Sequence, residues 1–364
     1  MKDFIDMIEF TNMLRGLFSK PHSRLFIVGD NSGWSTDIDA EDLNKIARRL
    51  GYSSNIIKRM YFNLPQAVHY TSQFSLLLKD IYKSKHRLSV DYYHGKPEDG
   101  ENFKKCFEAF KAHHEHFSAI RVSNKEMEGF LKTSGIAPEK VMRIPIGVDL
   151  DVFKPVTMEA RQAARAQFSI REDAVVIGSF QKDGVGWGEG LEPKLIKGPD
   201  IFLKVIENIK QEFPNVFVLL SGPSRGYIKQ GLEKLDVPYR HSFYQDYREI
   251  SKLYDALDLY IITSRVEGGP KACLESMAKG IPLLTTAVGQ CRDLVNHGQN
   301  AMMAAIEDID TLSKYALEIL KDKEKKNGLI REGFSTARQN SFDAQLPLWQ
   351  IYLSKLIDGS PDRK

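Results

Sequence analysis

The chain has 364 residues, 42% of them hydrophobic and 27% charged, which indicates a folded protein of about two domains rather than a disordered chain. Its formal net charge of +3 is too small to suggest nucleic acid as a partner. Acidic residues near the N-terminus, the lack of an apolar run of roughly 18 residues, and three cysteines without a CxxC pair together favour a cytoplasmic protein with no membrane span.

Short apolar runs alternate with helical patterns in the first half of the chain. A helix is expected from about residue 39 to residue 50, and Asn124 is a suitable N-cap for another that ends near Lys132. Strands are predicted at residues 25–28, 68–71, 88–93 and 119–122. Strands that alternate with helices predict a parallel sheet.

The same alternation resumes after residues 150–170, which we expect to be the linker. Predicted strands cover residues 175–178, 216–221, 258–263 and 281–285. Predicted helices cover residues 199–213, 227–234, 247–257, 272–279, 310–321 and 342–356. The two halves therefore repeat one α/β architecture.

The most informative segment joins the strand at 258–263 to the helix at 272–279. Glu267 and Glu275 lie eight positions apart across a glycine-rich turn. Pro270 suits the first turn of a helix, and the N–H groups after it, with the helix dipole, form an anion site. A phosphate at this helix start would have a carboxylate on either side, each able to accept hydrogen bonds from sugar hydroxyls.

This corner resembles the Glu-x7-Glu motif of glycosyltransferase family 4, a family of retaining enzymes of the GT-B type. Other stretches resemble the same family in the same order: Ser123-Asn124 with Pro138 to Asp149, Lys197 to Asp200, and Val288 to Val295. The resemblance covers roughly residues 115–305 and only loosely the first hundred residues. One such motif would be weak, whereas four in register are specific.

The resemblance implies an α/β GT-B fold, in which two Rossmann-like domains face each other across a cleft. The expected domains are residues 1–155, on the acceptor side, and residues 171–344, which bind the nucleotide sugar. The last helix, residues 345–364, is expected to pack back on the first domain.

The resemblance also implies a donor site. Lys197 is expected to meet the donor diphosphate, Glu267 the hydroxyls of the donor sugar, and Glu275 those of the ribose. Further donor-binding candidates are Gly268, Gly269, Pro270, Lys271, Ala272, Gly222 and Tyr244, the last as a surface for the base. The family usually has an arginine shortly before the lysine; here Lys182 is the candidate substitute.

An insert rich in glycine, residues 184–194, follows Lys182 and is a candidate lid that orders when the donor binds. In the first domain, His94 matches a family histidine near the reacting sugar, although a lone histidine is often structural. Gly29, Gly33 and Trp34 follow the first strand and are candidates for the acceptor side.

A metal cofactor is not expected. Three D-x-D strings begin at Asp37, Asp149 and Asp308, but two lie at helix starts and one in the linker. His113 and His116 share a helix face without a further ligand at zinc spacing. The basic run Lys83, Lys85, Arg87 is either a solvated turn or a weak contact with an anionic membrane surface or a lipid acceptor.

We therefore expect a cytoplasmic retaining glycosyltransferase, with possible peripheral contact at the inner membrane face. It would move a sugar from a nucleoside diphosphate sugar to a hydroxyl of a glycan or lipid-linked acceptor, in polysaccharide or cell-envelope synthesis. Two alternatives stay open: a GT-B nucleotide-sugar epimerase, and a nucleotide-sugar-binding protein without catalysis.

Overall fold

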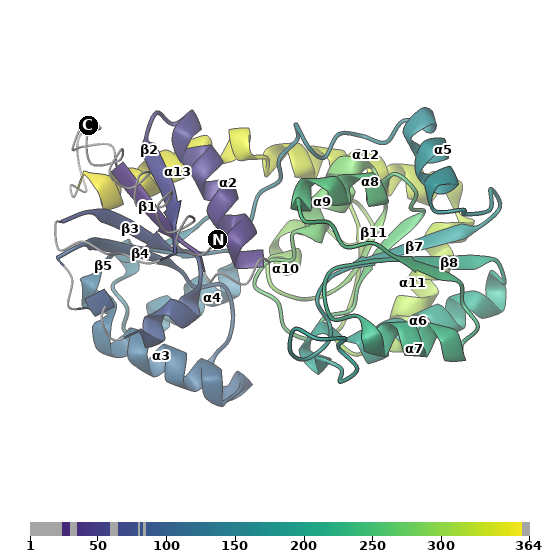
Figure 1. The fold of residues 1–364 in the computed structure, drawn as a ribbon, viewed down its shortest axis with the longest axis horizontal. Helices are drawn as coiled ribbons and strands as arrows, with labels where there is room; N and C mark the ends of the chain where they lie inside the picture. Colours follow the sequence, from purple (N-terminus) through teal and green to yellow (C-terminus); the bar gives the residue numbers. More distant parts are fainter. Residues whose placement is uncertain (1–23, 30–34, 59–64, 79–80, 83–84, 359–364) are drawn as a thin grey trace, which may run out of the picture. The chain divides into compact units, whose positions relative to one another are not determined.

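The computed structural model describes all residues except 1–23, 30–34, 59–64, 79–80, 83–84 and 359–364 (Figure 1). The chain divides into two compact units. Unit 1 is Met1–Pro145 with Gln345–Lys364, and unit 2 is Ile146–Ala344. We describe each unit by itself.

Unit 1 is built on a parallel sheet. Its strands in the described residues are β1 (Arg24–Val28), β2 (Ser53–Ile57), β3 (Ala67–Tyr70), β4 (Arg87–Asp91), β5 (Phe117–Val122) and β6 (Val141–Arg143). They lie in the order β2-β1-β3-β4-β5-β6, and every neighbouring pair is parallel. The first five strands thus have the order of a flavodoxin-like sheet.

Helices cover both faces of this sheet (Figure 1). The longer helices are α2 (Ser35–Arg49), α3 (Glu101–His113), α4 (Lys125–Thr133) and α13 (Phe342–Ile357), and the 3-10 turns are η2 (Gln73–Leu77), η4 (Pro97–Asp99), η5 (His114–His116) and η6 (Pro138–Lys140). Apolar residues of α3 and α4, such as Phe110 and Leu131, form one core with strand residues such as Val90. The expected cap is present, because the Asn124 side chain accepts a hydrogen bond from the Met127 N–H at 2.9 Å.

Unit 2 contains a second parallel sheet. Its strands are β7 (Val175–Phe180), β8 (Val216–Ser221), β9 (Tyr239–His241), β10 (Leu259–Ile262), β11 (Leu283–Thr286) and β12 (Met302–Ala304). Their order is β12-β11-β10-β7-β8-β9, which read from the other edge is the 3-2-1-4-5-6 order of the Rossmann fold. The strand order reverses between β7 and β10, where such folds bind their ligands.

Strand residues of unit 2 alternate between two cores, as the period of a strand requires. The helical elements are α5 (Met158–Gln167), η7 (Leu195–Lys197), α6 (Pro199–Glu212), α7 (Gly226–Lys234), η8 (Tyr247–Ile250), α8 (Ser251–Tyr254), α9 (Ala272–Lys279), α10 (Cys291–Leu294), α11 (Ile309–Lys321) and α12 (Lys323–Gln339). Val218 and Ile261 pack with α6, α7 and α11 on one face. Leu219 and Ile262 pack with α8 and α9 on the other.

The predicted α/β class with two parallel sheets is confirmed, with differences at element boundaries. Residues 146–155, expected in the first domain, belong to unit 2. The reason is that Ile146 exchanges hydrogen bonds with the Gln290 side chain and that Phe153 is buried in the unit 2 core. The expected linker contains α5, and the helix expected over 247–257 is a short η8 followed by α8. In the part of the chain that the structure describes, no helix is long and apolar enough to cross a membrane.

Candidate functional site

The two predicted glutamates flank the connection from β10 to α9. Glu267 lies in the loop, and its Oε1 is 2.6 Å from Lys197 Nζ. Ser264 Oγ donates to the same oxygen at 2.9 Å. The Glu267 side chain is 11% exposed and that of Lys197 is 22% exposed, so the pair is partly shielded from water and still reachable by a ligand.

The glycines of this loop allow it to pack on the segment before α10. The Gln290 N–H donates to the Gly268 carbonyl at 3.0 Å. A Cβ atom on Gly269 would lie 2.7 Å from Gln290 Oε1, and one on Gly289 would lie 2.4 Å from the Glu267 carbonyl oxygen. Larger residues would therefore push the loop away and displace Glu267.

Glu275 is buried on the inner side of α9, with a relative exposure of 4%. Its Oε1 accepts a hydrogen bond from Tyr247 OH at 2.7 Å, and its Oε2 accepts one from Tyr254 OH at 2.9 Å. The sequence pattern had not indicated these tyrosines. The two tyrosines hold one carboxylate oxygen each and so fix the orientation of the Glu275 side chain.

Lys197 is held at the end of β10 by a close backbone contact. Gly198 has a φ of +63°, and a Cβ atom there would lie 1.9 Å from the Thr263 carbonyl oxygen. Thr263 Oγ1 in turn donates to the Gly198 carbonyl at 2.8 Å. Only glycine allows the backbone at position 198 to come this close to Thr263. The contact places Lys197, the residue before Gly198, next to the loop that carries Glu267.

Lys182 follows β7 and Glu267 follows β10, the two strands between which the strand order reverses. Lys182 Nζ donates to the Gly184 carbonyl at 3.0 Å and lies 4.8 Å from the centre of the Trp187 ring. Burial, and then the charge of Lys197, lower the pKa of Lys182. The sheet topology thus brings together Lys182, Lys197 and Glu267.

The remaining donor-side candidates lie in three loops of unit 2. Pro270 and Lys271 precede α9, which begins at Ala272, and the Pro270 carbonyl accepts from the Cys273 N–H at 3.0 Å. Gly222 has a φ of +98° and packs against the Gln181 carbonyl, which accounts for the glycine without a ligand. Tyr244 lies on the loop before η8 and packs partly on the core. The roles of these residues in donor binding remain predictions.

The insert after Lys182 is hydrogen-bonded to the rest of unit 2 in this structure, and its action as a lid stays a prediction. The N–H groups of Gly226 and Tyr227 donate to the carbonyls of Glu189 and Gly190 at 2.7 and 2.8 Å. These bonds join the insert to the start of α7. A Cβ atom on Gly184 or Gly190 would lie 2.4 or 2.3 Å from the Ser224 carbonyl oxygen, which accounts for these two glycines, whereas one on Gly186 or Gly188 would meet no atom within 4 Å.

The candidates of the first domain lie in unit 1. The backbone of His94 is bonded to the Gln73 side chain, and its ring meets Phe103 edge-on with centroids 5.3 Å apart. Gly29 is buried after β1, where a Cβ atom would lie 2.2 Å from Asp37 Oδ1. Gly33 and Trp34 lie outside the described residues. The catalytic and acceptor-side roles of these residues remain predictions.

The motifs considered for metal binding have structural surroundings. Asp37 lies in the first turn of α2, and Asp308 caps α11 by accepting from the Thr311 N–H at 3.0 Å. His113 stacks on Tyr82 with centroids 4.0 Å apart. Within the described residues, no three His, Cys, Asp or Glu side chains gather as metal ligands.

Part of the chain is similar in sequence to known glycosyltransferases. Residues 191–336 match the family model described as glycosyl transferases group 1. The chain is 28% identical over 178 residues to a D-inositol 3-phosphate glycosyltransferase of Segniliparus rotundus, covering 46% of this chain and 37% of that protein. It is 22% identical over 270 residues to a mannosylfructose-phosphate synthase of Agrobacterium fabrum, covering 70% of this chain and 57% of that protein. The chain spans less than half the length of the first curated relatives that it matches.

Solved structures share the fold over nearly the whole chain. HepE of Anabaena, crystallised with UDP-glucose, has a TM-score of 0.73 at 16% identity, over 92% of this chain and 100% of its own. A sucrose-phosphate synthase of Thermosynechococcus elongatus also has a TM-score of 0.73, at 14% identity, over 93% of this chain and 100% of its own. The chain therefore has the fold of GT-B proteins, and its residues 191–336 resemble the glycosyl transferases group 1 family.

Proposed function

We propose that this chain is a retaining glycosyltransferase of the family 4 type. It takes a sugar from a nucleoside diphosphate sugar and transfers it to a hydroxyl of a glycan or lipid-linked acceptor, in polysaccharide or cell-envelope synthesis. The observation that supports this most is the ion pair of Lys197 and Glu267, formed where the strand order of unit 2 reverses and where the same corner carries the buried Glu275.

The leaving group of such a reaction is a nucleoside diphosphate. Negative charge grows on it as the bond to the sugar breaks, and cations already in place stabilise that charge. In the proposal, Lys197, Lys182 and the amides at the start of α9 supply this stabilisation. A diphosphate leaves without protonation, so Glu267 is assigned neither as an acid nor as a base, unlike the paired carboxylates of glycosidases.

The two glutamates position the donor in this proposal. Glu267 accepts hydrogen bonds from hydroxyls of the donor sugar and orients the ring. Glu275, fixed by Tyr247 and Tyr254, accepts them from the ribose. Lys197 has three N–H donors, so it can retain Glu267 as a partner and still donate to phosphate.

The experiment that tests the proposal is a turnover assay with uridine, guanosine and adenosine diphosphate sugars. Uridine diphosphate sugars come first, because HepE was crystallised with UDP-glucose. We expect one donor to release its nucleoside diphosphate, faster with simple sugars and sugar phosphates present as acceptors, and the product to keep the anomeric configuration of the donor. Glu267→Ala should abolish this release, whereas Glu249→Ala, on the exposed part of η8, should not.

Other results of this assay would overturn the proposal. An altered donor sugar formed with no acceptor present would indicate an epimerase. Tight donor binding without turnover for any donor and acceptor would indicate a binding protein.

Weak contact with an anionic membrane surface is a separate proposal. Lys85 is exposed and Arg87 opens β4, while Lys83 lies outside the described residues. Each basic residue near an anionic surface contributes about 1 kcal/mol. Replacing all three by serine should reduce binding to phosphatidylserine vesicles at low salt and leave donor affinity unchanged. If the wild-type protein does not bind such vesicles at low salt, the proposed membrane contact is wrong and the proposed activity is unaffected.

A further inference from the structure

Residues 184–194 form a small hairpin next to Lys182. Gly184 and Pro193 pair as an antiparallel bridge, and the Val185 N–H donates to the Glu192 carbonyl at 2.9 Å. Ser224 Oγ lies within hydrogen-bond distance of the carbonyls of Gly186 and Gly188, at 3.2 and 3.0 Å. With the two backbone bonds to the start of α7, these contacts hold the hairpin along its length.

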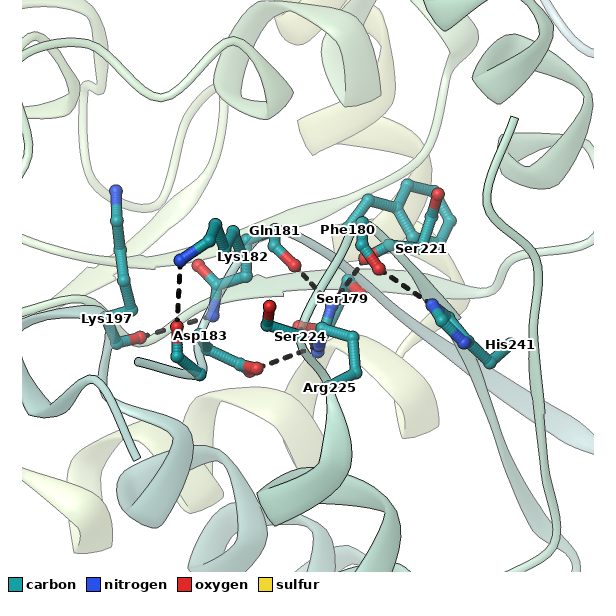
Figure 2. A network of polar contacts seen from close by, with 12 residues as sticks. Ser179, Phe180, Gln181, Lys182, Asp183, Lys197, Ser221, Ser224, Arg225 and His241 are labelled. Carbon is teal, nitrogen blue, oxygen red and sulfur yellow. Dashed lines mark hydrogen bonds and ion pairs between the residues drawn. The ribbon is translucent and has the colours of Figure 1, made fainter. Parts of the chain in front are cut away.

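The base of the hairpin is locked by a buried ion pair. Arg225 Nε lies 2.9 Å from Asp183 Oδ1, and their side chains are 0% and 1% exposed. Figure 2 shows the same guanidinium among the ends of β7 and β8, where it donates to the carbonyls of Ser179 and Ser221 at 2.7 and 2.6 Å. In the sequence, Asp183 stands between Lys182 and the hairpin. The ion pair of Asp183 with Arg225 therefore anchors the backbone from which Lys182 and the hairpin extend.

Lys194 ends the hairpin between the two lysines already considered. Its N–H donates to the Asp183 carbonyl at 2.7 Å, and its own carbonyl accepts from the Lys197 N–H at 2.8 Å. Lys194 is thus bonded through its backbone both to Lys197 and to Asp183, the residue after Lys182. The Lys194 side chain is only partly exposed.

The positive charge of these three lysines is not balanced. Among the described residues, Glu267 is the one carboxylate within ion-pair distance of any of them, and it pairs with Lys197. Burial lowers the pKa of Lys194, and the charges of Lys197 and Lys182 lower it further, while Glu267 acts in the opposite direction. Placing like charges together in a shielded site costs free energy unless an anion compensates them.

We propose that Lys194 is a third cation of the diphosphate site, beside Lys182 and Lys197, and that the hairpin positions it there. This inference rests on the proposed function, because it assigns a further residue to the donor site. Three lysines and one carboxylate leave two positive charges, which match the two negative charges of the diphosphate in a nucleotide sugar. The hydrogen bonds of the hairpin and the Asp183–Arg225 ion pair hold the Lys194 backbone in place without a ligand, so that less ordering is needed on binding.

A ligand-binding role and a structural role predict opposite effects on stability. If Lys194 held the fold together, removing its charge would lower the melting temperature. As an uncompensated cation it should do the reverse, so Lys194→Met should keep or raise the melting temperature while it weakens diphosphate binding. This combination is typical of residues selected for function at a cost in stability.

The test is isothermal titration calorimetry with UDP, GDP and ADP, followed by the monophosphate of whichever binds wild type most tightly. We expect Lys194→Met to weaken the diphosphate about tenfold, as for one charge-assisted hydrogen bond, and to change the monophosphate much less. Lys194→Arg should retain most of the affinity. The matched control is Lys204→Met, which removes an exposed lysine of α6 that pairs with Glu207.

The possible failures are distinguishable. If Lys194→Met binds the diphosphate as wild type does while Lys197→Met binds it weakly, the assignment of Lys194 is wrong and the proposed function stands. If Lys194→Met lowers the melting temperature and weakens both phosphates equally, the role is structural and the assignment is also wrong. If wild type binds none of UDP, GDP and ADP, the proposed function fails together with the inference.

Discussion

Both units bury charged side chains at their sheets, and they do so in different ways. In unit 1, Asp91 lies 3.3 Å from His69 and 3.3 Å from Arg121, and Tyr93 OH donates to it at 2.6 Å. In unit 2, Lys182, Lys194 and Lys197 share one carboxylate among the described residues. A fully buried charge paired with opposite charges serves the fold, whereas half-buried charges of one sign without enough partners indicate a missing ligand.

The network around Asp91 in unit 1 connects the C-terminal helix α13 to the sheet. Arg121 donates to the carbonyls of Ile144 and Pro145 at 3.0 and 3.2 Å, and it lies 4.6 Å from the centre of the Trp349 ring of α13. Burial would raise the pKa of Asp91, but the charges of His69 and Arg121 outweigh this and lower it. The carboxylate is thus kept ionised by protein groups and needs no ligand.

The largest effect should come from breaking the balanced network. Arg121→Met leaves Asp91 buried with less compensation and removes the contact with Trp349. We expect a loss of about 3–5 kcal/mol in the free energy of unfolding, as for other broken buried ion pairs. Urea denaturation followed by circular dichroism measures it. Arg143→Met, which removes a half-exposed pair with Glu128 in the same unit, should cost less than about 1 kcal/mol.

An Arg121→Met variant as stable as wild type would show that the unit 1 network does not stabilise the fold. The contrast between the two units would also fail if the folded variant lost nucleoside diphosphate affinity, because the unit 1 network would then be part of ligand binding.

The next effect concerns the buried carboxylate of unit 2. Glu275→Ala should weaken nucleoside diphosphate binding by about 1–3 kcal/mol, because ribose hydroxyls would enter a shielded site without acceptors. Tyr247→Phe keeps the carboxylate and removes one of the two bonds that orient it, so its effect should be smaller. Calorimetry on folded variants decides, and unchanged affinity in Glu275→Ala would reject the ribose assignment.

A smaller effect should appear with pH. Lys182 and Lys194 have lowered pKa values, caused first by burial and then by neighbouring lysines, against the opposing charges of Asp183 and Glu267. A bound diphosphate favours the protonated lysines, so binding takes up protons and affinity should fall as the pH rises through the lowered values. Calorimetry from neutral to alkaline pH measures this. A flat profile, or one that Lys194→Met leaves unchanged, would contradict it.

Removal of metal should have the smallest effect. Because lysines and helix amides neutralise the diphosphate in our proposal, turnover should survive EDTA. A complete loss that Mg²⁺ or Mn²⁺ restores would show that the lysines are not sufficient and would favour a D-x-D site.

Sequence reasoning worked best where the signal is local. The corner of Glu267 and Glu275 combines a strand, a glycine turn and a helix within thirty residues of sequence, and Asn124 is recognisable as a cap from its own neighbourhood. The fold class followed from the repeated alternation of such local patterns.

The missed features depend on pairing between distant segments. Tyr247 and Tyr254 lie more than twenty residues from Glu275, and aromatic residues there are equally consistent with a core. In unit 1, sheet register places Asp91 opposite Arg121, which no single strand reveals. Lys194 lies in a glycine-rich insert, and the ion pair of Asp183 with the distant Arg225 at the base of that insert has no signal in the sequence.

The central claim is that the unbalanced lysines of unit 2 form a diphosphate site. Its most direct test is the melting temperature of the wild-type protein with UDP, GDP and ADP and with the three monophosphates. A ligand that binds only the folded protein raises this temperature in proportion to the logarithm of its concentration over its dissociation constant. We predict that at least one diphosphate raises it clearly and that the matching monophosphate raises it much less. No shift with any diphosphate, or equal shifts with both phosphates, would contradict the account.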